Sequence, residues 1–453
     1  MIPSIRQQFQ TRSDAPPATV MGALKTPNFQ FDQIKTRIHQ QILEDMDLRR
    51  MDSLPADRLR QELQGLTESL IAQNQFALNE TERKQIAQGI QDEMLGLGPI
   101  EPLLADDSVS DILVNGPYKV FVERRGKIEP TDVRFDSEAH LLRVIDRIVS
   151  RIGRRIDEMS PMVDARLSDG SRVNAVIPPL AIDGPLLSIR RFAVVPYTVH
   201  DLLRFGTLTP NMAALIDGLV KAKLNVLISG GTGSGKTTLL NVISASIPPD
   251  ERIVSIEDAA ELQLQQPHVV RMETRPANME GAGEVSQRAL LRNSLRMRPD
   301  RIILGEVRGG EVLDMLQAMN TGHEGSMSTI HANTPRHAMT RLEHMLGMAG
   351  MQTDARSMRQ QIAAALTVVI QVSRLSDGQR KVISLQEITG MEGEVVTMQE
   401  IFRFEQTGLG AQGKVEGHFA ATGIRPKFMQ RLVSRGIALR DDLFSPTSPR
   451  PPA

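Results

Sequence analysis

The amino-acid sequence predicts an α/β protein with a wound sheet in its C-terminal half, preceded by a smaller α/β domain and an N-terminal helical module. Three observations carry this prediction. Apolar residues recur at helical spacing from about residue 31 to 98, short β-rich runs follow from about 101 to 195, and helical and strand patterns alternate from about 211 onward. Because 453 residues are too many for one compact core, two or three folded parts are expected.

The changes of pattern set the predicted boundaries. Both ends of the chain are polar and contain proline, so residues 1–30 and 441–453 are predicted to be disordered. The folded parts between them are predicted to be a helical module at 31–100, an N-terminal α/β domain at 101–195, a linker at 196–210 and a larger α/β domain at 211–440.

Each predicted element follows from a local pattern. In the helical module, apolar residues share helix faces at Ile34, Ile38, Ile42 and Met46, at Leu59, Leu63, Leu66 and Leu70, and at Ile86, Ile90 and Met94. The next part has strand-like runs DILVNG, KVFVERRG and SRVNAVIPP and a helix near EAHLLRVIDRIVSRIG. In the last part, helices NMAALIDGLV, TTLLNVISAS and SMRQQIAAAL alternate with strands LNVLIS, RIVSIED, TVVIQVSRL and RKVISLQEIT.

Composition narrows the class of protein. The net charge of -1 argues against a chain that mainly coats nucleic acid, and the absence of cysteine excludes disulfides and thiolate metal sites. The N-terminus shows no signal-peptide pattern, and the longest apolar run, IAAALTVVIQV, is about half of what a membrane-spanning helix needs. We therefore expect a soluble cytoplasmic protein with no direct membrane insertion.

One glycine-rich segment matches the phosphate-binding pattern G-x-x-x-x-G-K-[ST] at every fixed position. It follows the strand LNVLIS and opens a helix, which is the context the motif requires. Backbone N–H groups of such a loop surround phosphate, the lysine reaches the β- and γ-phosphates, and the threonine hydroxyl binds Mg²⁺. The predicted nucleotide-binding residues are Gly230, Gly231, Thr232, Gly233, Ser234, Gly235, Lys236, Thr237 and Thr238.

Acidic residues end the two strands expected near this loop. RIVSIED brings Glu257 and Asp258 to a strand end, where they would activate water or support Mg²⁺, although acids also favour helix starts. RIILGE ends in Glu306, a candidate to hold Mg²⁺-bound water. Gly305 stands where many ATPases carry an aspartate, so the magnesium site could be weakened.

Histidines and arginines complete the candidate set. TGHEGSMSTIHANTP contains His323 and His331, whose spacing disfavours a metal site and favours phosphate sensing by His331, with a structural role as the alternative. Four arginines lie in strand-like segments of the smaller α/β domain. By default we interpret them as a basic, solvent-exposed edge of the domain. The alternative is that one or two act as arginine fingers, and the candidates are Arg166, Arg172, Arg190 and Arg191.

The ordered set of motifs resembles a known superfamily. GGTGSGKTT, IEDAAEL, LRMRPDRIILGEVRGGE and TGHEGSMSTIHANTP resemble the Walker A, Asp, Walker B and His boxes of the type II/IV secretion ATPases. DARLSDGSRVNAVIPP, SIRRF and ATGIRPKFMQRL look most like the CpaF-type ATPases of Tad/Flp pilus assembly. That resemblance implies a RecA-like P-loop ATPase domain in a homohexamer at the cytoplasmic face of the inner membrane, which works on pilins or secreted proteins through membrane platform proteins.

The resemblance also implies roles for individual residues. Lys236 and Thr237 would bind phosphate and Mg²⁺, Glu257 and Glu306 would be the catalytic acids, and His323 or His331 would belong to the sensing box. Arg172 and Arg190 are the leading candidate fingers. The Gly-Glu pair at 305–306 agrees with this superfamily, whose Walker B box ordinarily carries glycine there.

Two other functions stay open at this point. A RecA-like nucleic-acid translocase is disfavoured by the near-neutral charge and by an aromatic content of 3% without tryptophan, which leaves few stacking platforms for bases. A nucleotide-gated scaffold with little turnover would follow if Gly305 weakened the magnesium site.

Overall fold

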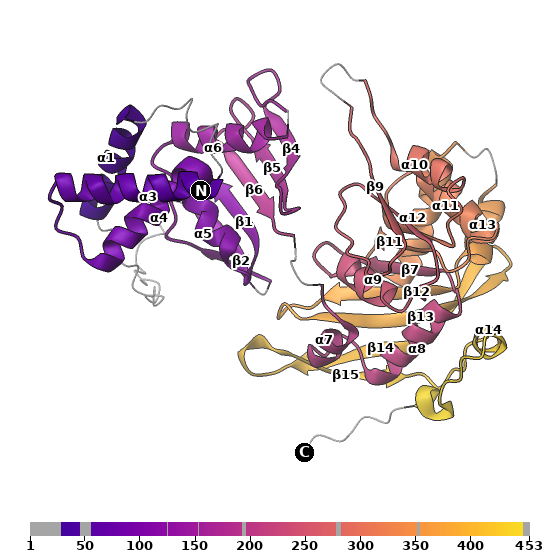
Figure 1. Ribbon diagram of the computed structural model, residues 1–453. Helices are drawn as coiled ribbons and strands as arrows, with labels where there is room; N and C mark the ends of the chain where they lie inside the picture. The colour runs from indigo at the N-terminus through magenta and orange to yellow at the C-terminus, as the bar shows by residue number, and fades with distance from the viewer. Residues whose placement is uncertain are drawn as a thin grey trace, which may run out of the picture. The chain divides into compact units, whose positions relative to one another are not determined.

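A computed structural model describes residues 29–45, 56–124, 126–152, 154–192, 196–277, 282–350 and 354–446. Contacts divide the chain into two compact units, which we describe separately (Figure 1). The first comprises Met1–Val122, Glu129–Ala165 and Asn174–Ser188, and the second comprises Glu123–Ile128, Arg166–Val173 and Ile189–Ala453. The boundaries read from the sequence stay a prediction.

The first unit begins with three helices, α1 (Phe29–Asp45), α3 (Ala56–Gln73) and α4 (Glu80–Leu95). Their predicted apolar faces meet in one buried cluster that contains Ile38, Ile42, Leu59, Leu63, Leu70, Ile71, Ile86 and Ile90. Helix α4 starts with a capping box, in which the Asn79 side chain accepts the Glu82 N–H and the Glu82 carboxylate accepts the Asn79 N–H. The predicted Met46 lies outside the described residues.

A six-stranded sheet follows, with strand order β3-β2-β1-β6-β5-β4. Alternating side chains of β1 are buried, as expected for a sheet with one covered face. Helix α6 buries its apolar stripe, including Leu141, Ile145 and Ile148, which matches the helix predicted there. The elements are η1 (Gly98–Ile100), α5 (Glu101–Ala105), β1 (Val109–Asn115), β2 (Val120–Arg124), β3 (Lys127–Pro130), α6 (Glu138–Ser150), β4 (Met162–Arg166), β5 (Arg172–Val176) and β6 (Leu186–Arg190).

The second unit is built on a nine-stranded sheet with order β15-β14-β13-β12-β7-β11-β10-β8-β9. Strands β12, β7, β11, β10, β8 and β9 run parallel, whereas β13, β14 and β15 continue the sheet antiparallel. The strands are β7 (Val226–Gly230), β8 (Ile253–Glu257), β9 (Val269–Glu273), β10 (Arg301–Val307), β11 (Met327–His331), β12 (Val368–Arg374), β13 (Arg380–Glu392), β14 (Val395–Leu409) and β15 (Val415–Ala421).

Helices cover both faces of the parallel part, which is the wound α/β arrangement predicted from the alternating pattern (Figure 1). Along β7, Val226 and Ile228 join the apolar cluster of α8 and α9, whereas Leu227 joins the cluster of α11, α12 and α13. The helical elements are α7 (Val199–Arg204), α8 (Pro210–Lys221), α9 (Lys236–Ser244), α10 (Gln287–Ser294), α11 (Glu311–Asn320), α12 (Pro335–Met348), α13 (Ala355–Ala365), η2 (Ala411–Gly413), α14 (Met429–Ser434) and η3 (Asp441–Phe444).

Part of the predicted disordered tail is structured. Residues Asp441–Phe444 form a 3₁₀ turn, and the side chains of Leu443 and Phe444 are buried in the core of the second unit. In the sequence these two apolar residues stand in a polar, Pro-rich segment and give no periodic signal. Among the helices of the described residues, none is long and apolar enough to cross a membrane.

A charged cluster inside the first unit joins α4 to α6. The buried Glu93 carboxylate lies 2.9 Å from His140 Nε2 and 3.3 Å from Lys35 Nζ. On α6, Arg147 Nη1 donates to the backbone oxygens of Glu93 and Gly96, at 2.6 and 2.7 Å. These carbonyls belong to the last turn of α4, whose exposed acceptors and dipole favour cations.

Burial alone would lower the pKa of His140, but hydrogen bonds and charge from Asp136 and Glu93 outweigh it and raise this pKa to about 9. The imidazole is therefore a cation at neutral pH. A pKa above the unfolded value of 6.5 gives stability that is complete below about pH 6.5 and is lost as pH rises through about 9.

We expect the free energy of unfolding to fall by roughly 2–3 kcal/mol between pH 7 and pH 10 through His140. Denaturant titrations of the whole chain and of His140→Gln at several pH values measure this contribution as the difference between the two curves. That difference should shrink toward zero at pH 10. A difference that is independent of pH would show that His140 is neutral in the folded protein.

Candidate functional site

The phosphate-binding segment predicted from the sequence connects β7 to α9. Gly233 and Gly235 have φ values of 67° and 95°, a region that favours glycine. At Gly230 the limit is space, because a Cβ atom would lie 2.4 Å from Ser234 Oγ and 2.6 Å from Val372 O. The three glycines are therefore required by the local backbone and packing.

Side chains of the loop also bind its own backbone. Ser234 Oγ donates to the Gly231 carbonyl at 2.8 Å, and Lys236 Nζ donates to the same oxygen at 3.1 Å. Burial lowers the pKa of Lys236, while the nearby charge of Glu306 acts in the opposite direction. Thr237 and Thr238 follow in the first turn of α9 and are half-buried. Lys236 and Glu306 thus lie within electrostatic range of each other.

Three other candidate residues lie at the carboxyl ends of the parallel strands. This is the edge of the sheet that also carries the phosphate loop. Glu257 is the last residue of β8, Glu306 lies near the end of β10, and His331 ends β11 opposite Gly230. His323 precedes β11, so it lies at the opposite edge of the sheet. The structure therefore brings His331 to the phosphate loop and separates His323 from it.

Gly305 makes room for Glu257. A Cβ atom at position 305 would lie 3.0 Å from Glu257 Cγ, which is closer than nearly all real contacts of this kind. The φ of Gly305 is not positive, so the need for glycine is one of space. An aspartate at 305 would occupy the volume that the Glu257 side chain fills.

The Glu257 side chain is only 3% exposed. Its Oε2 accepts the backbone N–H groups of Glu261 and Leu262, at 2.8 and 2.9 Å. Its buried Oε1 has no hydrogen-bond partner among the described residues. Burial raises the pKa of Glu257 to about 7, although these two N–H groups favour the charged form. Such a carboxyl can exchange a proton near neutral pH.

Arg308 connects two other acids at this edge. Its Nη2 lies 2.7 Å from Glu306 Oε2, and its Nη1 lies 3.2 Å from Asp258 Oδ2. The hydrogen bond to Glu306 raises the pKa of Arg308, with the charge of Asp258 adding to the effect. Arg308 is not among the site residues predicted from the sequence. Its position two residues after Glu306 is the signal that could have indicated it.

Two of the four candidate finger arginines form ion pairs within the second unit, one with the segment after β8 and one with the last residue of β9. Arg172 Nη1 lies 2.9 Å from Glu261 Oε1, and Arg166 Nη1 lies 2.6 Å from Glu273 Oε2. The backbone N–H of Glu261 donates to Glu257, so Glu261 connects Arg172 to that acid. Arg190 is the exposed last residue of β6, and Arg191 directly follows it.

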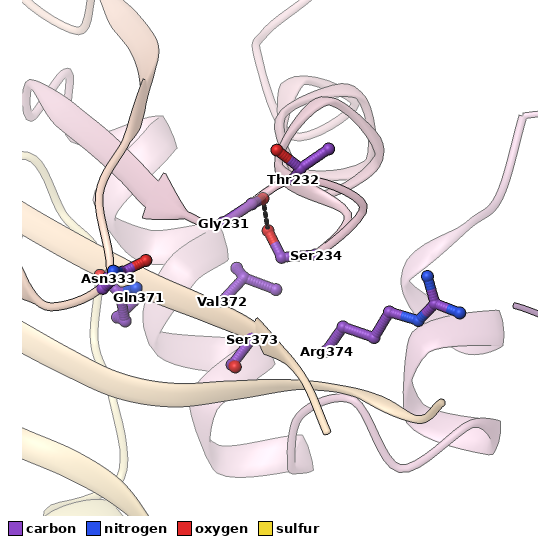
Figure 2. A pocket seen from close by; sticks show the side chains of 8 residues that line it. All are labelled: Gly231, Thr232, Ser234, Asn333, Gln371, Val372, Ser373 and Arg374. Atoms are coloured by element: carbon purple, nitrogen blue, oxygen red, sulfur yellow. Dashed lines mark hydrogen bonds between the residues drawn. The ribbon is translucent and has the colours of Figure 1, made fainter. Parts of the chain in front are cut away.

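A cavity of about 310 Å³ borders the phosphate loop (Figure 2). Its lining combines loop residues with the end of β12: Gly231, Thr232, Ser234, Asn333, Gln371, Val372, Ser373 and Arg374. In addition, Arg380 Nε donates to the Gly233 carbonyl at 3.0 Å. None of the residues from β12 and β13 was selected from the sequence. The available signal was a glutamine inside the apolar run TVVIQV, since buried polar groups need a partner.

Comparison with protein families identifies the chain. The model of the type II/IV secretion system protein family matches residues 93–414. The chain belongs to this family. With its intact phosphate loop, it is an ATPase of the type II/IV secretion family, as the motif resemblance predicted.

Similar proteins of this family occur in several bacteria. A Mycobacterium tuberculosis protein whose name assigns it to conjugal transfer is 41% identical over 324 residues, which cover 70% of this chain and 92% of the relative. Conjugal transfer protein TrbB of Rhizobium radiobacter is 34% identical and covers 64% of this chain and 86% of its own. The crystal structure of the Brucella suis VirB11 ATPase with sulphate aligns at 28% identity and a TM-score of 0.35, over 64% of this chain and 95% of that one.

Substitution Gly305→Ala should lower kcat on the order of 10², because the new methyl group would push Glu257 out of position. Nucleotide affinity should change little, since two strands, β11 and β10, lie between β8 and β7, the strand that leads into the phosphate loop. Steady-state hydrolysis and binding of a fluorescent ADP analogue measure the two quantities. Gly408→Ala is the matched control, because Gly408 also lies in a strand and a Cβ there meets nothing within 4 Å. Equal kcat in both variants would contradict this role of Gly305.

Proposed function

We propose that this ATPase is a homohexameric motor that drives assembly of a Tad/Flp pilus, or protein secretion, from the cytoplasmic face of the inner membrane. Family membership and the names of its relatives in conjugal transfer support work on a secretion machine. The segments DARLSDGSRVNAVIPP and SIRRF support the CpaF-type branch by resemblance. Inner-membrane platform proteins would be its partners, and pilins or secreted proteins its cargo.

The observation that carries the catalytic part of the proposal is the pairing of Glu257 with Gly305. A buried carboxyl with a pKa of about 7, held by two backbone N–H groups, is suited to accept a proton from water. We assign Glu257 as the general base. Glu306, which directly follows Gly305, is then available to bind Mg²⁺.

The oxygen donors at the strand edge fit Mg²⁺, which prefers hydroxyl and carboxylate ligands. We propose that the Thr237 hydroxyl and Glu306 hold it, with Lys236 and the backbone N–H groups of the loop on the phosphates of ATP. Bound Mg²⁺ would neutralise phosphate charge. Glu306 must then release Arg308, whose 58% exposed side chain is free to move into solvent. The pairing of His331 with Gly230 in the sheet supports a role for His331 in sensing the terminal phosphate.

The scaffold alternative loses its main argument. Gly305 suggested a weakened magnesium site, but its contact with Glu257 accounts for the glycine without any loss of catalysis. The nucleic-acid translocase alternative keeps no specific observation in its favour. ATPase stimulation by single-stranded DNA at physiological salt would revive it.

Substitution Lys236→Ala should abolish ATP hydrolysis, because it removes the charge that contacts the phosphates. Substitution Glu257→Gln should lower kcat by roughly 10²–10⁴ while ATP remains bound, since it removes only the base. Phosphate release from prebound ATP in single-turnover experiments tests both. Unchanged thermal unfolding midpoints would establish that the variants are folded, and undiminished turnover in Lys236→Ala would refute the assigned ATP site.

Substitution Arg172→Ala should lower kcat on the order of 10³ and change ATP affinity less, if this guanidinium stabilises the transferred phosphate. Arg190→Ala is measured in parallel. Arg403→Ala serves as control, because Arg403 also forms an exposed ion pair, with Glu405 on β14.

The ion pair of Arg172 gives this test a second arm. If Arg172 served only to hold Glu261, then Glu261→Gln would lower kcat as much as Arg172→Ala. A larger loss in Arg172→Ala supports a finger, and unchanged kcat in both Arg172→Ala and Arg190→Ala would exclude one at these positions.

A further inference from the structure

Gln371 is a buried amide at the border of the phosphate loop. It lies on the parallel strand β12 opposite Ser229 of β7, and its side chain is 1% exposed. It also lines the cavity of about 310 Å³ beside Gly231 and Thr232 (Figure 2). Its neighbours in the segment VVIQV are apolar, and burying an amide among them costs free energy unless both of its polar atoms find partners.

One polar atom of this amide has its partner. Gln371 Nε2 donates to the Ala332 carbonyl at 3.1 Å, and Ser229 Oγ donates to the same oxygen at 3.4 Å. Because a carbonyl can only accept, the atom facing Ala332 must be the nitrogen. Ala332 directly follows His331, so this bond fixes the end of β11 relative to β12.

The other polar atom of this amide, the buried Gln371 Oε1, has no hydrogen-bond partner within the described residues. An amide oxygen is an acceptor, so its partner must be a donor. The cavity that Gln371 lines opens beside the phosphate loop, and water is the donor that fits next to bound phosphate.

We propose that Gln371 is a positioning residue for ATP hydrolysis: Nε2 fixes the end of the strand that carries His331, and Oε1 holds a water molecule that contacts the terminal phosphate. The inference rests on the proposed assignment of the phosphate loop as the ATP site. It adds a polar contact from β12, on the side of β7 opposite to the strands that carry Glu257 and Glu306.

Gln371→Met keeps the length of the side chain and removes both hydrogen bonds. We expect kcat to fall roughly tenfold and the KM for ATP to change less than threefold, because the contacts act on the position of the phosphate and of β11. Gln371→Glu places a negative charge at the cavity. It should therefore weaken binding of a non-hydrolysable ATP analogue more than binding of ADP, as measured by displacement of a fluorescent nucleotide.

Gln266 offers a matched control within the same sheet domain. Its Nε2 donates to the backbone oxygens of Ser244 and Ile247, and its buried Oε1 also lacks a partner among the described residues. It lies at the far end of α9 from the phosphate loop. Gln266→Met should lower the thermal unfolding midpoint as Gln371→Met does and leave kcat within twofold.

Three results would overturn the inference. They are a kcat within twofold of the parent in Gln371→Met, equal kcat losses in the Gln371 and Gln266 variants, and equal weakening of ADP and the ATP analogue in Gln371→Glu. Each of these differs from failure of the ATP site itself, which would appear as turnover retained in Lys236→Ala.

Discussion

The contact between Glu257 and Gly305 joins two neighbouring parallel strands at the point where both end. Strands β8 and β10 pair in register from Ile253 to Ile256, so their carboxyl ends reach the same edge. There the Glu257 side chain fills the volume that a side chain at 305 would need. Burial then follows from this packing, and the raised pKa of Glu257 follows from burial. The position of one glycine thus sets both where the acid lies and how readily it exchanges a proton.

The same edge depends on a sheet that is covered on both faces. Apolar residues of β7 alternate between the cluster of α8 and α9 and the cluster of α11, α12 and α13, so the strand cannot slip by one residue without exposing both sets. That fixed register places His331 opposite Gly230 and Gln371 opposite Ser229. Precision at the site is therefore a consequence of the core.

The sequence predicted what depends on local pattern. The phosphate loop is a contiguous motif, and Glu257 and Glu306 each end an apolar run. All three could therefore be predicted without knowledge of contacts between distant residues. The sequence favoured His331 over His323 from the neighbouring motifs alone, and the bounds of β11 show that His323 precedes this strand whereas His331 ends it. Gln371 and His140 each have a hydrogen-bond partner far along the chain, Ala332 and Glu93, which lie 39 and 47 residues away, so no local pattern could indicate these two contacts. Gly305 was noticed from the sequence, but its reason is a contact with another strand.

Two charges at this edge are disfavoured for the same physical reason. Burial lowers the pKa of Lys236 and raises that of Glu257, so the protein alone holds the positive and the negative group less readily in their charged forms. A phosphate next to Lys236 would restore the stability of its charge, and it would exchange the bond to the Gly231 carbonyl for a stronger one to an anion. A cation beside Glu306 would likewise favour the carboxylate of Glu257. Nucleotide and Mg²⁺ would therefore bind more tightly together than separately, and their arrival would prepare Glu257 to accept a proton when the phosphate is in place.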